Sequence, residues 1–326
     1  MTELDVRVER FPIAGKFVIS RGAKTEAVVV VATLTSGGFK GRGESVPYAR
    51  YGESVESVLA QIESLRDAIE AGEDRHGLQK RLPPGAARNA LDCAFWDLAA
   101  KQVGLRVYEL LDLPAPKPLT TAFTISAGTP AEMAEAAARA SPRPLLKLKL
   151  AGEGDAERLA AVRAATPDAM LIVDANEAWS ESRLEPLLEA CALAGVALVE
   201  QPLPAGQDKI LAKIRRIVPV AADESVHDRP GLEALRDRYD AINIKLDKTG
   251  GLTEALALAE EAKGLGFDLM IGCMVASSLA MAPALILTGD ARFVDLDGPL
   301  LLAQDRPAGL HYEGSTVFPA TPDLWG

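Results

Sequence analysis

Lysines and acids recur at the ends of predicted strands, and their spacing constrains the fold more than any other feature of the chain. In order, these residues are Lys149, Asp174, Glu200, Asp223 and Lys245, and successive members lie 25, 26, 23 and 22 residues apart. Each gap fits one β-strand with one connecting helix. The sequence therefore predicts a parallel barrel that carries one such residue on each of five consecutive strands.

Eight short segments after residue 118 have the apolar, β-branched character of buried strands. Helical patterns, such as residues 131–140, 155–165 and 253–265, lie between most of them. Strands buried on both faces with helices between them indicate a parallel sheet, and eight of them close into a barrel. The strand candidates are residues 120–126, 145–150, 170–174, 197–200, 218–223, 241–246, 268–273 and 293–297.

The first third of the chain has a different pattern, with strands first and helices afterwards. Proline occupies every second position from Pro114 to Pro118, and this segment is predicted to be the linker that follows the unit. We therefore expect a separate α+β domain over residues 1–118. Its predicted strands are residues 6–10, 27–34 and 39–44, and its predicted helices are residues 54–69 and 86–101.

Charge and cysteine usage exclude several classes of protein. The formal net charge is -11 and the basic residues are scattered among acids, which argues against a nucleic-acid surface. Cys93, Cys191 and Cys273 are far apart and form no C-x-x-C pair, so neither a disulfide framework nor a thiolate zinc site is indicated. A small molecule is the expected partner, and a homo-oligomer is compatible with the sequence without being specified by it.

No targeting or membrane segment is indicated. The acidic N-terminal residues lack the basic and then apolar order of an export signal. Residues 269–287 are apolar, but Gly272 and Pro283 are among the residues that interrupt them, so a buried strand followed by a buried helix is predicted. We expect a cytoplasmic protein without membrane contact.

The carboxyl ends of the strands meet at one mouth of such a barrel. Asp174, Glu200 and Asp223 would come from three neighbouring strands and form an all-oxygen cage that suits Mg²⁺. Lys149 on strand two and Lys245 on strand six stand four apart in a ring of eight, so their amines should face each other across the mouth. The sequence predicts a metal site between two opposed amines.

This arrangement suits the movement of a proton on and off a carbon beside a carboxylate. Removal of that proton makes a doubly charged enediolate, which a divalent cation must neutralise. A lysine acts as base only when burial or a neighbouring cation lowers its pKa. Lys147 shares a strand face with Lys149, so it should reach the same cleft and pair with the substrate carboxylate. Two opposed lysines predict a two-base reaction with inversion at carbon.

The motifs around these residues resemble the enolase superfamily, and within it the muconate-lactonising-type subgroup. The resemblance rests on K-L-K at 147–149, V-D-A-N, V-E-Q-P, A-D-E-S and N-I-K-L-D-K-T-G-G taken together, and it extends over the whole chain. It implies Mg²⁺ as cofactor and a modified TIM-type (β/α)7β barrel at residues 119–298, with an N-terminal α+β capping domain. The C-terminal segment, residues 299–326, is expected to return to that capping domain.

Strand eight carries a further resemblance, to the dipeptide epimerases. Asp295 and Asp297 match their D-x-D, whose carboxylates bind the α-ammonium of the substrate. Arg21, in the loop at 19–22, resembles an arginine placed over the second residue's side chain, and Thr124 and Cys273 match positions that line the pocket. The resemblance implies epimerisation of a dipeptide by 1,1-proton transfer. Its nearest counterpart is the interconversion of L-Ala-D-Glu and L-Ala-L-Glu in cell-wall peptide recycling.

Other functions stay open at this point. The same scaffold supports o-succinylbenzoate synthase, muconate cycloisomerase and N-acylamino acid racemase reactions, whose substrates have no free ammonium for the D-x-D acids. A Schiff-base aldolase could use Lys245, although three metal-type acids argue against it. A non-catalytic peptide binder would have no need of both lysines and all three acids. The preferred dipeptide is not specified by the sequence.

Overall fold

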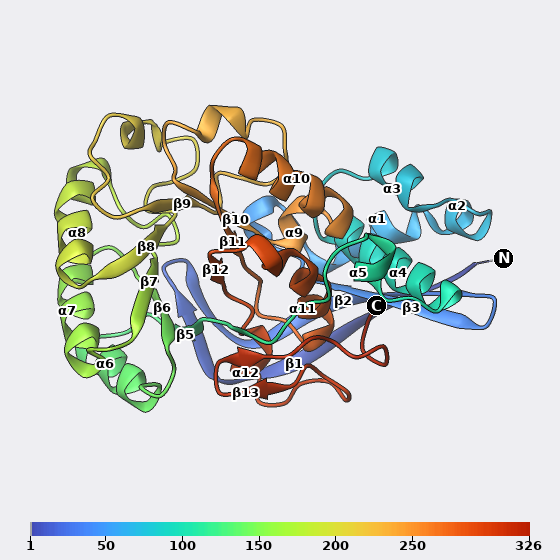
Figure 1. Ribbon diagram of the computed structural model, residues 1–326, viewed down its shortest axis with the longest axis horizontal. Coiled ribbons are helices and arrows are strands. Elements are labelled where there is room, and N and C mark those ends of the chain that lie inside the picture. The colour runs from blue at the N-terminus through green and yellow to red at the C-terminus, as the bar shows by residue number, and fades with distance from the viewer. Residues whose placement is uncertain (1) are drawn as a thin grey trace.

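A curled sheet of eight parallel strands forms the larger half of the computed structural model, which describes residues 2–326 (Figure 1). The strands follow one another round the sheet in chain order. The N–H of Ala122 donates to the carbonyl of Val294 at 2.8 Å and joins the first strand to the last. The predicted barrel class is confirmed. Its strands are β5 (Phe123–Ile125), β6 (Leu145–Lys149), β7 (Met170–Asp174), β8 (Val196–Glu200), β9 (Val220–Ala222), β10 (Ala241–Ile244), β11 (Asp268–Ile271) and β12 (Phe293–Val294).

The inner face of the barrel has an apolar layer below a polar one. Each of the eight strand segments contributes one buried apolar residue, and these eight residues form a separate core cluster. Because side chains on one strand face repeat every two residues, the next inward position of each strand lies one layer nearer the mouth. That second layer is mostly polar and holds the predicted chemical residues. The apolar layer consists of Ala122, Leu145, Ile172, Leu198, Ala221, Ala241, Met270 and Phe293.

Helices cover the outside of most of the barrel, as the sequence predicts. They are α6 (Pro130–Arg139), α7 (Asp155–Ala165), α8 (Glu181–Leu193), α9 (Leu246–Thr249), α10 (Leu252–Gly264), α11 (Ser278–Ala284) and α12 (Gly298–Leu301), with a 3-10 turn η4 at Leu285–Asp290. The apolar stretch at 269–287 forms the end of β11 and then α11 and the start of η4, as expected. Among the helices of the described part of the chain, none is long and apolar enough to cross a membrane.

Two crossovers lack an α-helix, those between β8 and β9 and between β9 and β10. They contain only the 3-10 turns η2 (Lys209–Ala212) and η3 (Glu233–Leu235). Prolines and glycines break both segments, for example Pro204 and Pro230. A buried hydrogen-bond network around Asp208 replaces the missing helix packing. Its carboxylate accepts from the Tyr239 hydroxyl at 2.6 Å and from the Ser225 hydroxyl at 2.7 Å.

The capping domain combines an antiparallel sheet with a layer of helices (Figure 1). A long hairpin, β1 and β2, extends from this domain to the mouth of the barrel, so distant parts of the sequence meet there. The strands are β1 (Glu3–Ile19), β2 (Gly22–Ser36) and β3 (Phe39–Ser45). The helices are η1 (Ala49–Tyr51), α1 (Val55–Glu63), α2 (Arg66–Glu70), α3 (Arg75–Arg81), α4 (Ala86–Val103) and α5 (Val107–Leu110).

Two capping elements differ from the sequence prediction. The strand expected at 6–10 continues through a register shift between Pro12 and Phe17 and ends at Ile19, because its mostly apolar outer half pairs with β2 and forms a small core with Ala27 and Leu302. The helix expected at 54–69 is two helices, α1 and α2. The break falls at Ser64 and Leu65, where Leu65 has a φ of -101° and a ψ of 0° and the Ser64 hydroxyl donates to the Gln61 carbonyl at 2.7 Å.

The C-terminal segment contacts both halves of the molecule. Its strand β14 (Thr316–Val317) pairs with β4 (Leu119–Thr120) on one side and β13 (Tyr312–Glu313) on the other. At its end, the Trp325 indole N–H donates to the Cys93 carbonyl of α4 at 3.0 Å. The domain bounds at 118 and 298 themselves stay a prediction.

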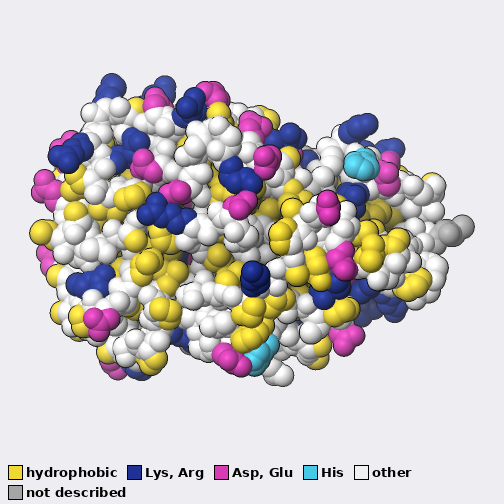
Figure 2. Space-filling view, in the orientation of Figure 1, with side chains coloured by type: hydrophobic (Ala, Val, Ile, Leu, Met, Phe, Trp, Pro, Cys, Tyr) yellow, Lys and Arg dark blue, Asp and Glu magenta, His cyan; other side chains and the backbone are white. Residues whose placement is uncertain are grey.

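The visible face mixes basic and acidic side chains and shows no basic stripe (Figure 2).

Candidate functional site

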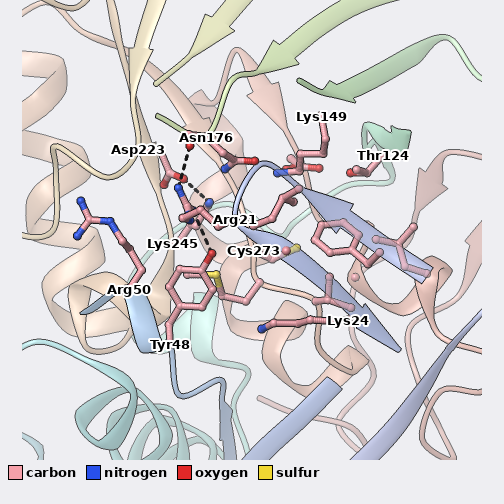
Figure 3. Close-up of a pocket in the computed structure, with 18 of the residues that line it drawn as sticks. Arg21, Lys24, Tyr48, Arg50, Thr124, Lys149, Asn176, Asp223, Lys245 and Cys273 are labelled. Carbon is pink, nitrogen blue, oxygen red and sulfur yellow. Dashed lines mark hydrogen bonds and ion pairs between the residues drawn. The ribbon is translucent and has the colours of Figure 1, made fainter. Parts of the chain in front are cut away.

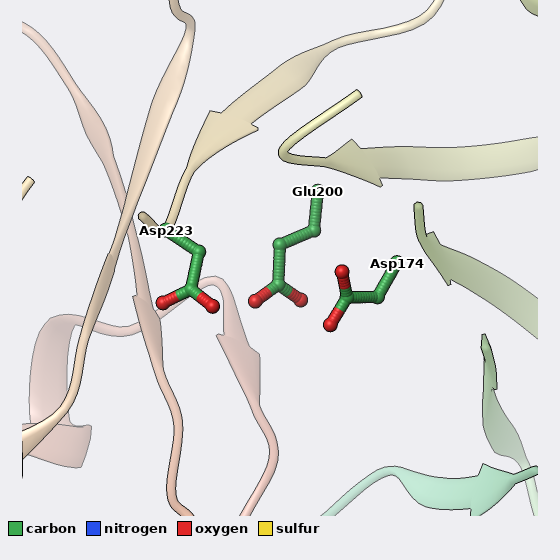
Figure 4. Close-up of side chains that lie close together, drawn as sticks. All are labelled: Asp174, Glu200 and Asp223. Atoms are coloured by element: carbon green, nitrogen blue, oxygen red, sulfur yellow. The ribbon is translucent and has the colours of Figure 1, made fainter. Parts of the chain in front are cut away.

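Three carboxylates converge at the mouth of the barrel from neighbouring strands (Figure 4). Asp174 and Glu200 are the last residues of β7 and β8 and lie opposite each other in the register, and Asp223 directly follows β9. One oxygen from each lies within 4.8 Å of the others. All three side chains are buried, at 0%, 1% and 2% exposure. Burial, together with the charge of Asp174, raises the pKa of Glu200.

This donor set fits a hard divalent cation. Three desolvated carboxylates repel one another, and oxygen ligands at this spacing suit Mg²⁺ better than a soft metal. The amide of Asn243 donates to Glu200 Oε1 at 2.6 Å and orients that carboxylate. The ammonium of Lys248 lies 2.6 Å from Asp223 Oδ1 and also donates to the Asn243 carbonyl at 2.8 Å. Asp174, Glu200 and Asp223 could therefore hold Mg²⁺ with their orientation fixed by neighbours.

Lys149 and Lys245 bracket the acid cluster and line the same cavity (Figure 3). Lys149 Nζ lies 2.6 Å from Asp174 Oδ2, at one end of the cluster. Lys245 Nζ lies 2.6 Å from Asp223 Oδ2, at the other end. Burial by itself lowers the pKa of Lys245, but the charges of Asp223 and Glu200 outweigh burial and hold it well above the usual range. The two amines are thus brought together with the acids in one site.

Lys147 lies deeper than the sequence predicts. Its side chain is 1% exposed, and it is not among the residues that line the cavity. Its ammonium lies 2.6 Å from Glu200 Oε2 and 2.7 Å from Asp295 Oδ2. The amine therefore neutralises two buried acids, because the second inward position of β6, after Leu145, still faces the interior and only the third, Lys149, opens to the cavity. Direct contact of Lys147 with a substrate stays a prediction.

The two acids after β12 both line the cavity. Asp297 Oδ2 accepts from the Thr124 N–H at 2.6 Å, and burial, together with the charge of Asp295, raises the pKa of Asp297 to about 7. One oxygen of Asp295 contacts Lys147, whereas its Oδ1 is buried and has no hydrogen-bond partner among the residues that the structure describes. An unpaired buried carboxylate oxygen is costly unless a ligand satisfies it. This oxygen indicates a cationic group on the ligand.

Thr124 and Cys273 also line the cavity. Thr124 acts through its main chain, by the N–H that holds Asp297. Burial raises the pKa of the Cys273 thiol well above its usual range, so a thiolate nucleophile is disfavoured and the residue contributes wall surface. The cavity has a volume of about 430 Å³, and the capping hairpin forms one side of it.

Arg21, at the tip of the hairpin, reaches the cavity but is already engaged. Its guanidinium lies 2.7 Å from Glu224 Oε1 and donates to the Asn176 carbonyl at 2.9 Å. It also donates to the Tyr48 hydroxyl at 3.1 Å. These contacts fasten the hairpin to the ends of β7 and β9. The predicted grip of Arg21 on a substrate carboxylate has to compete with them, and it stays a prediction.

Sequence reasoning missed several residues of the cavity, which come from the hairpin, from η1 or from loops: Lys24, Tyr48, Arg50, Tyr51 and Glu224. Glu224 stands in the A-D-E-S motif next to a proposed ligand, which was a usable signal. Burial and the charges of Asp223 and Asp174 raise its pKa to about 7. The others had no signal in the sequence, because only the docking of the capping domain brings them to the mouth.

Family models match both halves of the chain. Residues 1–112 match the mandelate racemase / muconate lactonizing enzyme N-terminal domain, and residues 131–300 match the enolase C-terminal domain-like family. The chain belongs to the enolase superfamily. The predicted resemblance is thereby confirmed, and the two matched regions correspond to the capping domain and the barrel.

Individual members of the family are similar over nearly the full length. The chain is 49% identical to an L-Ala-D/L-Glu epimerase of Escherichia coli, over 96% of this chain and 98% of the relative. It is 45% identical to an N-acetyl-D-glutamate racemase of Pseudoalteromonas, over 91% of this chain and 95% of the relative. Both relatives are named as isomerases, the first as an epimerase and the second as a racemase.

Solved structures of the family have the same fold. An enolase family member from Agrobacterium tumefaciens with homology to dipeptide epimerases, solved with sodium and L-Ala-L-Glu, is 54% identical with a TM-score of 0.98 over 100% of both chains. A dipeptide epimerase from Enterococcus faecalis, solved with Mg and L-Leu-L-Tyr, is 27% identical with a TM-score of 0.89, over 98% of this chain and 96% of that one.

Proposed function

We propose that this protein epimerises dipeptides at the α-carbon of the C-terminal residue, with L-Ala-D-Glu and L-Ala-L-Glu as the favoured pair. One observation carries the proposal: Lys149 and Lys245 bracket a buried cluster of three acids inside a single cavity. The chain is an isomerase that uses Mg²⁺, like the relatives solved with Mg and a dipeptide.

Each residue has a separate role in the proposed reaction. Asp174, Glu200 and Asp223 would hold Mg²⁺, which supplies the positive charge that makes the proton beside a carboxylate removable. One lysine, as neutral amine, takes the α-proton from one face; for Lys245, the charges of Asp223 and Glu200 that raise its pKa would be offset by bound Mg²⁺. The other, as ammonium, returns a proton to the opposite face, so the configuration inverts.

The amino end of the dipeptide is placed by the acids of strand eight. The free oxygen of Asp295 and the carboxyl of Asp297 accept hydrogen bonds from the α-ammonium, which fixes the reacting carbon between the lysines. A substrate without that cation leaves Asp295 Oδ1 unpaired. This pair therefore selects peptides with a free amino terminus.

The test is exchange of the α-proton. The purified protein is incubated with Mg²⁺ and L-Ala-L-Glu in D₂O, and the α-proton signal of the glutamate residue is followed by NMR. We expect that signal to disappear while that of alanine stays, and chelation of the metal to stop the exchange. Retention of the glutamate signal across a panel of dipeptides, with Mg²⁺ present, would refute the proposal.

A second candidate, racemisation of N-acylated glutamate, is favoured by the similarity to the Pseudoalteromonas racemase. The two functions differ in their need for the strand-eight acids. Under the dipeptide proposal, Asp297→Asn lowers activity on L-Ala-L-Glu about 10- to 100-fold, because one partner of the ammonium loses its charge. Wild-type protein that exchanges N-acetylglutamate but no dipeptide, with a rate unaffected by Asp297→Asn, would establish the second candidate instead.

We also propose that the substrates arise from cell-wall peptides and are processed in the cytoplasm. The support is chemical, since the Ala-Glu unit is part of those peptides and the E. coli relative carries that substrate in its name. Deletion of the gene should cause L-Ala-D-Glu to accumulate in cell extracts, and fractionation should recover the protein with cytoplasmic markers.

A further inference from the structure

The two lysines of the site are held in place by different parts of the molecule. Lys149 ends β6 and lies opposite Asp174 of β7 in the parallel register, so the sheet itself fixes its backbone. Lys245 follows the last residue of β10 and is the N-cap of α9, with φ and ψ of -124° and 129°. Its position therefore depends on the placement of this short helix as well as on the sheet.

Helix α9 is too short to be stable by itself. It contains 4 residues, whereas an isolated helix is marginal in water below about 12 residues. The carbonyl groups at its C-terminal end also have no partner within the helix. Contacts with other elements must therefore hold α9 in place.

Helix α4 of the capping domain supplies such contacts. The Arg88 guanidinium donates to the Thr249 carbonyl at 2.7 Å and to the Gly250 carbonyl at 3.1 Å, at the C-terminal end of α9. The next residue, Asn89, donates from its amide to Asp247 Oδ1 at 2.8 Å. Two successive residues of the capping-domain helix thus bind the helix that begins at the site.

The turn after α9 allows this close approach. Gly250 and Gly251 have positive φ values of 73° and 109°. A Cβ added at Gly250 would lie 2.5 Å from Arg88 Nε, and one at Gly251 would lie 2.5 Å from Asp92 Cβ. The two glycines therefore let α4 meet the end of α9 at backbone distance.

Arg88 is a costly residue for this place. Its side chain is 6% exposed, and its third contact is again a carbonyl, that of Leu82 at 3.2 Å. Burial lowers the pKa of Arg88, and the charges of surrounding acids offset only part of that effect. An apolar side chain would fill the space without desolvating a charge. What it could not supply is a planar fork of donors that orients two consecutive carbonyls.

We propose that Arg88 is a positioning residue for Lys245, which acts through α9 and leaves Lys149 unaffected. The inference rests on the proposed two-base epimerisation, in which each lysine serves one face of the α-carbon. Loss of the guanidinium frees the end of α9 to shift, and a displacement of about 1 Å near a reacting group can lower the rate about 100-fold. The capping domain thus supports one half of the proton transfer.

The readout is exchange of the α-proton of glutamate in D₂O at saturating Mg²⁺, measured by NMR from L-Ala-L-Glu and from L-Ala-D-Glu separately. Rates of inversion in the two directions are tied to each other by the equilibrium constant. Exchange without inversion is not, because removal of the proton from each epimer reports on one lysine. Lys245→Ala identifies the epimer that faces Lys245, since exchange from that epimer is the one that is lost.

Arg88→Met removes the fork of donors and keeps an apolar stem. We expect exchange from the epimer that faces Lys245 to fall about 10- to 100-fold, and exchange from the other epimer to change by less than about 3-fold. The direction of this difference should match that of Lys245→Ala and be opposite to that of Lys149→Ala. A purely structural loss would lower both rates equally.

Two further variants complete the design. Arg88→Lys keeps a cation within reach of the carbonyls but loses the fork, so it should show the same difference to a smaller degree. Arg75→Met is the matched control, because Arg75 is a half-buried arginine of the same domain whose guanidinium stacks on Trp96, with 3.5 Å from Cζ to the ring centroid. It should leave the ratio of the two exchange rates unchanged. Circular dichroism at the assay temperature checks that each variant is folded.

The outcomes separate this inference from the proposed function. Equal losses on both epimers with Arg88→Met, no loss on either, or a larger loss on the epimer that faces Lys149 would overturn the role of Arg88, while wild-type exchange still supports epimerisation. A wild-type protein that exchanges neither epimer would overturn the proposed function itself. If Arg88→Met does not fold, Arg88→Lys decides the question, and equal exchange ratios for it and the wild type would count against Arg88.

Discussion

At the scale of single residues, two inward-facing residues that lie two positions apart on one strand can have different roles, the first in the apolar core and the second in the candidate site. Ile172 belongs to the apolar layer of the barrel, whereas Asp174 on the same face belongs to the acid cluster. On β6 the same face carries Leu145, Lys147 and Lys149 in succession, from core to buried ion pair to open cavity. The depth of a residue therefore decides whether its charge is structural or available to a substrate.

The two cavity lysines should act on opposite faces of the substrate. Lys149→Ala and Lys245→Ala are each expected to lower epimerisation at least about 1000-fold, because general acid–base catalysis at this level is lost. Each variant should still exchange the α-proton of one epimer of the dipeptide in D₂O, and the two variants should differ in which epimer that is. NMR of both epimers with each variant measures this directly.

A matched control for that experiment is Lys16→Ala, an exposed lysine on the capping hairpin. It should epimerise at the wild-type rate. If either cavity-lysine variant inverted its substrate at full rate, the two-base mechanism would be wrong.

At the scale of elements, close contact between β3 and α4 depends on two glycines. A Cβ added at Gly41 would lie 2.2 Å from the Ala94 carbonyl oxygen, and one at Gly43 would lie 2.1 Å from the Ala90 carbonyl oxygen. These are backbone atoms of a buried helix and cannot move without shifting α4 as a whole. The sheet and helix of the capping domain are therefore packed at backbone distance.

Gly43→Ala is predicted to lower the free energy of unfolding by about 3 kcal/mol, the upper part of the usual cost of overpacking. Denaturant unfolding followed by circular dichroism measures it. Gly289→Ala serves as control, because an added Cβ there meets nothing within 4 Å and the residue is exposed. A stability of Gly43→Ala equal to that of the control would contradict the packing argument.

The crossovers without helices depend on the buried carboxylate of Asp208. Asp208→Ala removes the acceptor of Tyr239 and Ser225 and leaves Arg238, which is 16% exposed, with only the more distant Asp237, at 3.9 Å, as an acidic partner. We expect a loss of about 2 to 4 kcal/mol in the free energy of unfolding. The neighbouring Asp237 is 72% exposed, so Asp237→Ala should change stability by less than about 0.5 kcal/mol. Equal unfolding midpoints for the two variants would show that the network does not stabilise these loops.

At the scale of the whole molecule, the capping domain and barrel meet through buried polar groups. Asp247, just after β10, accepts hydrogen bonds from the Val46 N–H at 2.9 Å and the Asn89 amide at 2.8 Å. Burial raises the pKa of Asp247 to about 7, although the two hydrogen bonds act to lower it. The charges of Glu53 and Glu44 add to the rise. The domain interface therefore contains a carboxyl that is costly to ionise.

That shift predicts a pH dependence of stability. The unfolded chain releases this proton near pH 4 and the folded chain near pH 7, so the folded state binds more protons between the two values. Stability from this group is highest below about pH 4 and falls as the pH rises to about 7. In Asp247→Asn the amide oxygen still accepts both bonds, and the fall should be smaller. Thermal unfolding of both proteins at several pH values measures it; parallel curves for the two would contradict it.

Much of the fold and site could be predicted because both follow from periodicity. The spacing of Lys149, Asp174, Glu200, Asp223 and Lys245 fixed one residue per strand, and parallel strands bring their carboxyl ends together whatever the loops do. The hairpin was harder to predict. Its outer half, residues 12–19, contains Pro12 and Gly15 and is mostly half-buried or exposed, so it shows no strict alternation of apolar and polar residues that would mark a strand.

The order of chemical residues along the barrel, and with it the acid cluster and the lysines at its two ends, was determined by the sequence itself. Only the tertiary structure decided which charge is available: Lys147 is neutralised by two acids, Arg21 is held by Glu224, and Lys24 has no acidic partner within residues 2–326. The physical reason is that these pairings join residues up to about 200 positions apart. They depend on how the two domains dock, which local pattern does not encode.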